Sequence, residues 1–440
     1  MSKGTGWAHT ISKEIAQTTH KPVKDASGAT SLGVIDILED QVSTWSAWWD
    51  EKATTKQGSD MQMLTADQQK GIRTFTAVEI AQVAKSFSES TSQTDSWHPR
   101  HFAYCSTEAR EVLATLFSIF EYTGKYPTNA QDSLVALISK PDGGLRPISL
   151  FRSAFRLHSR LMSKVVKQWA SGLTSAAINM ASGRHVLDAT YRLMVRQALA
   201  INSTSKPKHH CDVLWDLRKA FENVSRKDLW DAGIEHGYPM HVLRVSIESY
   251  KWDRLLCLGP LVSRPIAASR GIAAGSAFAT YELSLLFLTT IHKHQTMFPQ
   301  VVLSIHVDDI SQSSSHQDEE ELIKVMHDSA SFLHKAFVEE MSMPLAEEKC
   351  QILASNNSIA SILSKSFAGK VGQPCQVVKR LGADYYINKT YKKKLATRAK
   401  RTAIAKVRAK ILRKLRKKAI TSKIFHSGVM PATTYGAELH

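Results

Sequence analysis

The chain has 440 residues, 43% of them hydrophobic, which is enough for at least one sizeable buried core and favours division into subdomains. Its five cysteines lie far apart, so neither a disulfide-rich scaffold nor a Cys-x-x-Cys zinc site is predicted. The most apolar stretch, residues 272–291, is interrupted by Glu282, and the amino terminus has no apolar core, so we predict neither a membrane span nor a signal peptide.

The basic charge is concentrated near the carboxyl end. The formal net charge is +17, and residues 389–418 hold 15 Lys and Arg without any Asp or Glu. Nearly all of the basic excess therefore lies in one segment, where we expect a polyanionic partner to bind. The alternative interpretation is a solvated run of charges.

In chain order, the first predicted feature is a tryptophan cluster within residues 1–70, which are otherwise weakly patterned. Trp45, Trp48 and Trp49 have the three- and four-residue spacing of one helix face. The simplest interpretation is a helix that docks onto the main body.

Helices are predicted next over residues 77–88 and 107–122, the second of which begins near Glu108 and ends before Gly124. From Asp132 onward the chain has short apolar runs bounded by turn residues, such as SLVALISK, DVLWDL and VVLSIHVDDI, which indicate strands. Further helical patterns are interleaved with these strands, over residues 151–169, 227–236, 319–342 and 391–418. This mixture without a regular βαβ repeat predicts an α+β fold.

Carboxylates stand at the ends of two predicted strands. VVLSIHVDDI presents Asp308 and Asp309 side by side, and DVLWDL ends at Asp216. Burying an ionised carboxylate without compensation is costly, so these positions imply solvent, a cation, or both. Three such carboxylates can hold two Mg²⁺ ions for phosphoryl displacement, whereas Asp-Asp alone is also compatible with a plain turn.

The segments LISKPDGGLRPISL, LWDLRKAFENV, RGIAAGS, HVDD and VKRLGADY follow one another in the order and spacing of reverse transcriptase motifs. The resemblance covers about residues 96–384 and is closest to enzymes of non-LTR retrotransposons, including divergent dinoflagellate copies. It implies a right-hand polymerase fold, with fingers, a palm with an antiparallel sheet, and the start of a helical thumb. The implied divisions are an N-terminal extension at 1–70, fingers with part of the palm at 71–210, palm at 211–388, and the thumb helix at 389–440.

The resemblance also implies catalytic roles. Asp216 and Asp308 match the principal ligands of two Mg²⁺ ions, with Mn²⁺ as a possible substitute, and Asp309 matches the third carboxylate. Lys349 matches a proposed general acid for pyrophosphate. The alternative for Lys349 is a helix-end lysine paired with Glu347 or Glu348.

Four residues match the nucleotide site of the family. Lys140 and Arg146 match cations that reach the triphosphate, although by local sequence alone a solvated hairpin turn is the better explanation. Phe221 matches the steric gate that excludes a 2′-hydroxyl, with a core phenylalanine as the alternative. Gly275 matches the glycine that admits backbone close to the nascent base pair, with an ordinary turn glycine as the alternative.

Other positions match the nucleic-acid grip of the family. Leu381 and Gly382 correspond to the hairpin that positions the primer. The expected phosphate contacts of the basic helix are Lys406, Arg408, Lys410, Arg413 and Lys414.

The sequence departs from the family pattern near these motifs. Ala274 stands where many members have Gln, and Ala277 and Ala279 replace the usual Pro and Ser. His306 replaces the usual aromatic residue before the Asp pair, and we interpret it as a packed or hydrogen-bonded histidine rather than a metal ligand.

The resulting hypothesis is an RNA-directed DNA polymerase that binds an RNA template, a DNA primer and dNTPs in an intracellular, nuclear setting. One alternative is a decayed or domesticated copy that binds nucleic acid without catalysis. Another is a viral-type RNA polymerase, which Phe221 disfavours. We recognise no endonuclease, RNase H or Cys/His knuckle sequence, and the sequence leaves open whether the chain is a fragment of a longer gene product.

Overall fold

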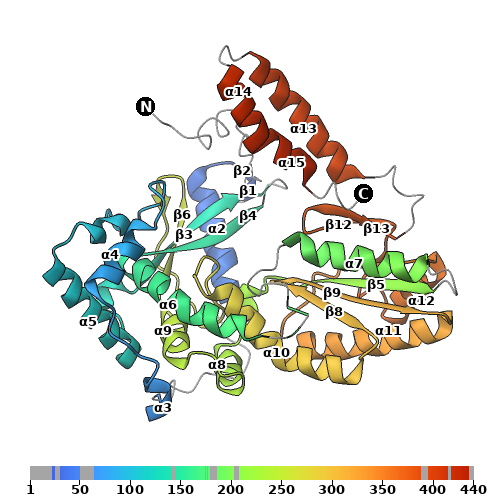
Figure 1. Cartoon of the computed structure of the whole chain (residues 1–440), viewed down its shortest axis with the longest axis horizontal. Helices are drawn as coiled ribbons and strands as arrows, with labels where there is room; N and C mark the ends of the chain where they lie inside the picture. Colours follow the sequence, from blue (N-terminus) through green and yellow to red (C-terminus); the bar gives the residue numbers. More distant parts are fainter. Residues whose placement is uncertain are drawn as a thin grey trace.

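The computed structural model describes residues 22–24, 30–49, 64–140, 144–173, 175, 177–178, 186–202, 208–387, 395–414 and 418–435. Two sheets with their helices lie side by side, and a helical hairpin stands above them (Figure 1). The α-helices of these residues are α2 (Val34–Trp49), α3 (Ala66–Gln69), α4 (Ala77–Lys85), α5 (Thr107–Thr123), α6 (Ser153–Ser171), α7 (Val186–Ile201), α8 (Arg226–Glu235), α9 (Met240–Tyr250), α10 (Ala279–Met297), α11 (Glu319–His334), α12 (Asn357–Ser366), α13 (Ala396–Arg413), α14 (Lys418–Ile424) and α15 (Met430–Thr434).

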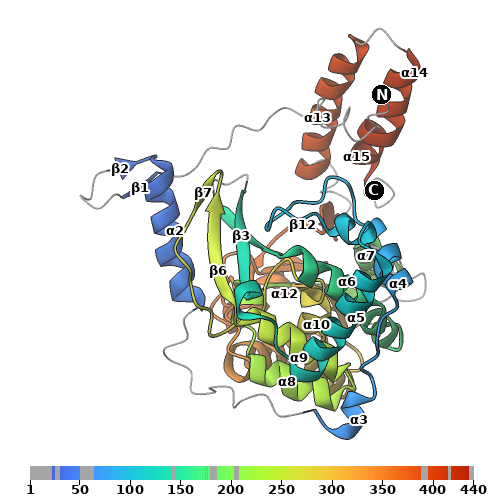
Figure 2. The ribbon, with the colours of Figure 1, turned by 90° about the vertical axis from the view of Figure 1, so that its left-hand side faces the viewer.

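The first sheet has the strand order β4-β3-β6-β7. β3 (Asp132–Ser139) pairs antiparallel with β4 (Leu145–Phe151) and parallel with β6 (Asp253–Leu258), which pairs with β7 (Leu261–Val262). Helix α2 packs against β6, as Figure 2 shows. We call these four strands the fingers sheet.

The second sheet, which we call the palm sheet, has the strand order β11-β10-β5-β9-β8. Its strands are β5 (His209–Asp216), β8 (Val302–His306), β9 (Asp309–His316), β10 (Gln351–Ala354) and β11 (Gln373–Pro374). Trp215 and Ile310 are directly opposed on one face of the palm sheet, and this face packs in the main core with α10 and α11. Successive residues of a strand point to opposite faces, so Asp212 and Asp216 of β5 both lie on the other face.

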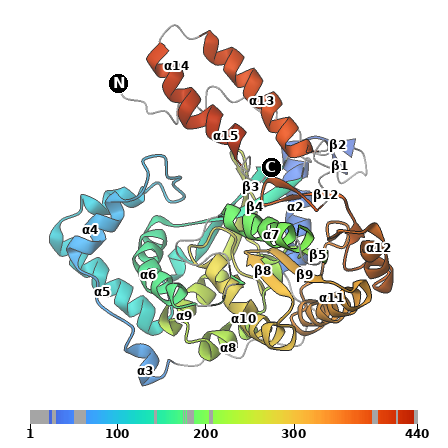
Figure 3. The same ribbon diagram turned by 45° about the vertical axis from the view of Figure 1, so that its right-hand side comes forward.

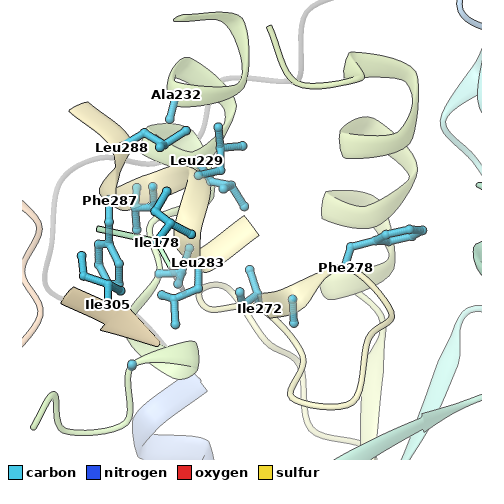
Figure 4. Packing of buried hydrophobic residues seen from close by; sticks show 14 of the residues in the cluster. Ile178, Leu229, Ala232, Ile272, Phe278, Leu283, Phe287, Leu288 and Ile305 are labelled. Atoms are coloured by element: carbon cyan, nitrogen blue, oxygen red, sulfur yellow. The ribbon is translucent and has the colours of Figure 1, made fainter. Parts of the chain in front are cut away.

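The main core continues from the palm sheet into the helices beneath it. Figure 4 shows Leu283 and Phe287 of α10 packed near Leu229 of α8 and Ile305 of β8. All four side chains are almost completely buried. This packing gives the palm sheet a rigid support.

A hairpin covers part of the other face of the palm sheet. It consists of β12 (Val377–Arg380) and β13 (Ala383–Tyr386) and packs with α7 through Leu193, Val378 and Tyr385. The Tyr385 hydroxyl donates a hydrogen bond to Asp212. The hairpin is thereby anchored to the centre of β5. A further short hairpin, β1 (Val23–Lys24) and β2 (Thr30–Ser31), precedes α2.

The α+β class is confirmed, and most of the expected elements are present. Helix α5 begins at the N-cap Ser106 and ends at Gly124, which adopts the left-handed conformation with φ 72°. Residues 319–342 form α11 and then a π-helical turn, Lys335–Glu340. Trp45 and Trp49 are buried on α2, so the docking interpretation is also confirmed.

The basic segment differs from its prediction. The expected helix over residues 391–418 is observed as α13, and α14 begins separately at Lys418, while residues 391–394 and 415–417 lie outside the described part. Helices α13 and α15 lie against each other (Figure 3), and Leu412 is buried with Ile424 and Val429. Folding back buries these apolar side chains, which a single continuous helix would leave in water. No described helix combines the length and the apolar character that crossing a membrane requires.

Candidate active site

Three carboxylates lie at one end of the palm sheet. Asp216 is the last residue of β5 and is directly opposed to Asp309, the first residue of β9. Asp308 precedes Asp309 in the turn from β8, directly after Val307, whose φ is 59°. The predicted strand ends and the turn are thus confirmed, and the structure brings the three residues to the same edge.

The carboxylates affect one another electrostatically. Burial raises the pKa of Asp216, and the charge of Asp308 adds to this while Lys349 opposes it. Burial and Asp308 likewise raise the pKa of Asp309, and Arg380 opposes the shift. Clustered carboxylates of this kind repel one another, and a cation placed among them would relieve the repulsion.

Carboxylate oxygens are the donors that Mg²⁺ prefers, so the residues present fit a divalent ion. In the described part of the chain, no three His, Cys, Asp or Glu side chains lie close enough to enclose a metal ion on their own. Mg²⁺ is commonly held by one or two carboxylates, with water and substrate phosphates completing its shell. Asp216, Asp308 and Asp309 are the residues that would supply the protein's share.

Lys349 lies beside this group. Its Nζ is 3.8 Å from Oδ1 of Asp216, and its side chain is 62% exposed. Glu348, one of the two alternative partners predicted for Lys349, instead pairs with Arg218, with 3.4 Å between Oε2 of Glu348 and Nη2 of Arg218. The structure therefore places Lys349 beside Asp216, and its role as a general acid stays a prediction.

The fingers hairpin carries Lys140 and Arg146. The Lys140 N–H donates to the Gly144 carbonyl at 2.7 Å and closes the turn, whose residues 141–143 lie outside the described part. Arg146 is exposed on β4, opposite Ile138. No ion pair or hydrogen bond among the described residues joins Arg146 to the carboxylates.

Phe221 begins the 3-10 turn Phe221–Asn223, which follows β5. Its ring is half-buried and packs against the main core, and its carbonyl accepts a hydrogen bond from the Ile272 N–H at 2.8 Å. This bond fixes the segment RGIAAGS against the end of β5. The role of Phe221 as a steric gate stays a prediction.

Gly275 has a physical requirement for glycine. Its φ is 114°, and a Cβ built there would lie 2.3 Å from the Ser149 carbonyl oxygen. The neighbouring Ala274 carbonyl accepts a hydrogen bond from the Ser149 N–H at 2.6 Å. Gly275 therefore permits close contact between RGIAAGS and β4 and is not an ordinary turn glycine. Its predicted contact with a base pair stays a prediction.

A buried polar pair supports the same segment from behind. The Tyr250 hydroxyl contacts Oε2 of Glu282 and lies 3.0 Å from Oγ of Ser276. Glu282 is fully buried, and burial raises its pKa to about 7. The residue after Gly275 is thus linked to a carboxyl that titrates near neutral pH.

The turn between β12 and β13 contains Leu381 and Gly382, with φ of 46° and 83°. The Leu381 carbonyl accepts a hydrogen bond from the Tyr435 hydroxyl at 3.0 Å. The carboxylate of Asp384 accepts hydrogen bonds from the N–H groups of Thr397 and Arg398, at 3.1 and 2.9 Å. The predicted hairpin is present, and it holds the first turn of α13.

The cations of α13 do not share one environment. Lys406, Lys410, Arg413 and Lys414 are exposed, whereas Arg408 is half-buried and lines a cavity of about 170 Å³ beside Val429. Three apolar side chains of the same helix, Ile404, Val407 and Ile411, remain 42%, 42% and 38% exposed. Leu412 is buried because it packs with Ile424, the last residue of α14, and with Val429.

Two residues escaped the interpretation of the sequence. Arg380 is buried beside Asp309 and Asp212, and the described residues offer no hydrogen-bond partner to its Nε and Nη2. Lys219 lies between Asp216 and Phe221, close to Lys140 and Lys349. Arg380 lies within VKRLGADY and Lys219 within LWDLRKAFENV, and other residues of both motifs had been assigned roles. A basic residue without a role inside such a motif was the signal that could have identified them.

His306 is half-buried next to the carboxylates. Its Nδ1 is buried without a hydrogen-bond partner among the described residues, and burial lowers its pKa. The packed interpretation agrees with this burial, whereas no hydrogen bond to Nδ1 is observed there.

Comparison with known proteins gives one family match. The family model described as reverse transcriptase (RNA-dependent DNA polymerase) matches residues 138–383, which is more than half of the chain. No curated protein matches the sequence. A similar solved structure is apo telomerase from Candida tropicalis, truncated from its C-terminal domain, with 11% identity and a TM-score of 0.43; the match covers 69% of this chain and 63% of that one. The chain belongs to the reverse transcriptase family and has its right-hand polymerase fold.

Proposed function

We propose that this chain is an active RNA-directed DNA polymerase from a non-LTR retrotransposon, which adds dNTPs to a primer 3′-hydroxyl on an RNA template. The observation that carries the proposal is the meeting of Asp216, Asp308 and Asp309 at one end of the palm sheet. The form of the motifs, such as RGIAAGS and HVDD, supports the non-LTR origin.

Asp216 and Asp308 would hold two divalent ions, with Asp309 beside them. Bound ions of this kind activate an attacking hydroxyl and stabilise the leaving oxygen of an in-line displacement. Lys349, 3.8 Å from Asp216, would donate a proton to the departing pyrophosphate. Lys140 and Arg146 would bind the triphosphate from the fingers hairpin.

The remaining residues would select and position the substrates. Phe221 would exclude the 2′-hydroxyl of a ribonucleotide, and Gly275 would keep RGIAAGS against β4. Leu381 and Gly382 would hold the primer end, while the exposed cations of α13 would bind backbone phosphates. We assign residues 1–70 to an N-terminal extension, 71–210 to fingers with part of the palm, 211–388 to palm and 389–440 to thumb, except that β6 and β7, within 211–388, belong to the fingers sheet.

The proposal is tested by primer extension with the purified chain, a primed RNA template and Mg²⁺ or Mn²⁺, supplied with either dNTPs or rNTPs. We expect extension with dNTPs on RNA. Extension with rNTPs alone would favour an RNA polymerase. Binding of the primed template without extension in either metal would favour a decayed copy, for which the altered residues Ala274, Ala277 and Ala279 are the supporting observation.

A further inference from the structure

Four buried polar side chains form a hydrogen-bonded chain behind the carboxylate end of the palm sheet. Nε1 of Trp215 donates to Oε1 of Gln312 at 2.9 Å, and Nε2 of Gln312 donates to Oγ of Ser329 at 2.6 Å. Oγ of Ser329 lies 2.8 Å from Nε2 of His294. All four residues are at most 3% exposed, and they come from β5, β9, α11 and α10. We call these four residues the polar bridge.

The direction of these hydrogen bonds is determined by Trp215, because an indole N–H can only donate. Oε1 of Gln312 accepts from it, so the amide nitrogen of Gln312 donates toward Ser329 and also lies 3.3 Å from Nε2 of His294. Burial lowers the pKa of His294 to about 4, so the ring is neutral at pH 7, and its Nε2 can accept. Nδ1 of His294 is buried without a partner among the described residues, which costs stability at this end of the polar bridge.

Strand β9 has few side chains that could determine its register. Its sequence is DISQSSSH, in which Ile310 is the only apolar residue. Gln312 and Ser314 follow Ile310 on the face toward the core, where an antiparallel strand usually carries apolar residues. Register is weakly specified in a strand that is polar on both faces. The position of β9 therefore depends on its polar contacts.

The turn before β9 determines its register on one side only. His306 of β8 is opposed to Asp309 of β9 across the two-residue loop 307–308, and so short a loop sets the pairing of these two strands. The pairing of β9 with β5 has no such turn, because these strands lie far apart in the sequence. Side-chain contacts between β5 and β9 must supply that information.

The hydrogen bond between Trp215 and Gln312 is specific to one register. Trp215 is opposed to Ile310, so Gln312 is its diagonal neighbour, within reach of a long side chain. A slip of one residue would turn Gln312 to the opposite face, and a slip of two would move it about 7 Å along the strand. The bond thus forms in the register that places Asp309 opposite Asp216.

Stability alone does not explain a glutamine at this position. Burying an amide costs free energy unless its hydrogen bonds are made, and an apolar side chain in a core avoids that cost. A polar network whose members are paired makes the arrangement of a core unique, because other arrangements leave its groups unpaired. The polar bridge therefore fits a role in selecting one arrangement of β5 and β9.

We propose that Gln312 is a positioning residue for the catalytic carboxylates, whose hydrogen bond to Trp215 fixes the register of β9 against β5 and keeps Asp309 opposite Asp216. The effect on register follows from the fold alone. The effect on metal binding rests on the proposed polymerase function, because it assumes that these carboxylates hold a divalent ion.

The test compares variants that remove one or both partners of this hydrogen bond. Trp215→Phe keeps an aromatic ring without the N–H donor, and Gln312→Met keeps the length of the side chain without the amide. The double variant Trp215→Phe/Gln312→Met leaves neither partner unpaired. Trp169→Phe is the matched control, because Nε1 of Trp169 donates to the His236 carbonyl at 3.0 Å, outside the palm sheet.

Three properties are measured on the full chain. Amide hydrogen exchange of β9, followed by mass spectrometry, reports how firmly this strand is paired. Urea denaturation gives the free energy of unfolding. Electron paramagnetic resonance gives the affinity for Mn²⁺ in a complex with an RNA template and a primer that ends in a dideoxynucleotide, so that no extension occurs. Mn²⁺ binding that persists in Asp308→Asn is subtracted as background.

We expect each single variant to exchange its β9 amides about 10-fold faster and to bind Mn²⁺ about 10-fold more weakly, the lower end of the range for groups that orient metal ligands. Each should also be less stable, because one buried polar group loses its partner. The double variant should regain much of this stability, whereas its fast exchange and weak Mn²⁺ binding should persist, because an apolar pair does not select one register. Trp169→Phe should lose stability but keep wild-type β9 exchange and Mn²⁺ affinity.

Unchanged β9 exchange in the folded single variants would overturn the inference. Wild-type exchange and Mn²⁺ affinity in the double variant would also overturn it, because the hydrogen bond would then act on stability alone. The positioning role is likewise wrong if the wild type binds Mn²⁺ and every variant binds it equally well. If the wild type neither binds Mn²⁺ nor extends a 3′-hydroxyl primer, the proposed function fails, while faster β9 exchange in the variants would still support the fixed register. If Gln312→Met does not fold, Trp215→Phe and the double variant decide the outcome.

Discussion

Asp216 and Asp309 are directly opposed in the antiparallel pair of β5 and β9, at the end of the palm sheet. Directly opposed residues of an antiparallel pair place their side chains on the same face, within about 5.5 Å of each other at Cβ. Two like charges in this position are destabilising unless something offsets them. The opposition of these two carboxylates therefore costs stability, which a cation would recover, and this relationship is the basis of the polymerase account.

Phe221→Ala should relax the choice of sugar. Removing the half-buried ring opens space where a 2′-hydroxyl would lie, so we expect more ribonucleotide incorporation and a smaller loss of DNA synthesis. The measurement is the ratio of kcat/KM for dNTP and rNTP in primer extension. A ratio equal to that of the wild type would show that Phe221 is a core residue and not a gate.

Gly275→Ala should destabilise the fold and displace RGIAAGS. The new Cβ would lie 2.3 Å from the Ser149 carbonyl oxygen at a φ of 114°, so we expect a loss of about 2 kcal/mol or more in the free energy of unfolding. Gly259→Ala is the control, because Gly259 has φ 62° and a Cβ added there would meet no atom within 4 Å. Urea denaturation should show a loss of about 1 kcal/mol for the control. Equal losses for the two variants would contradict the close contact with β4.

Glu282 should make stability depend on pH. Burial raises its pKa from 4.5 to about 7, so the folded chain keeps a proton that the unfolded chain releases between these values. The stabilisation is present below about pH 4.5 and is lost as the pH rises to about 7, by roughly 3 kcal/mol in total. Urea denaturation at several pH values should show this decline.

Glu282→Gln should remove that decline, because the amide does not titrate, and Glu111→Gln, at an exposed position, should retain it. A decline of the same size in Glu282→Gln would assign the pH dependence to another group.

The exposed cations of α13 should contact phosphates. Replacing Lys406, Lys410, Arg413 and Lys414 with Gln should weaken binding of template–primer on all sequences alike. The slope of log K against log salt should become less steep by roughly 3 to 4, from about 0.9 per phosphate for duplex DNA. Arg408→Gln should affect the slope less, because Arg408 lines the cavity beside Val429. An unchanged slope in the folded fourfold variant would show that these charges face water.

The sequence predicted the features that depend on local pattern. The apolar runs became strands, and α5 ends before Gly124 as predicted, whereas its N-cap, Ser106, was not part of the prediction. The motifs also predicted that Asp216 and Asp308 would meet, because their order matched a known family. The pairing itself joins strands far apart in the chain, so no local pattern determines its register.

Contacts between distant segments were not predictable in the same way. The position of Lys219 over Trp45 joins a motif residue to a helix with no motif, and only tertiary packing reveals it. The end of α13 at Arg413 depends on burial of Leu412 against Ile424 and Val429. Helical periodicity alone could not distinguish this folded-back arrangement from one long helix.

Asp308→Asn gives the most direct test of the polymerase account. The purified variant is compared with the wild type and with Asp231→Asn, an exposed control, in primer extension on an RNA template and in binding of the same template–primer. We expect Asp308→Asn to lose extension while it keeps its fold and its binding, because a neutral amide replaces a charge needed to hold two cations close together. Extension at the wild-type rate by Asp308→Asn would contradict the account.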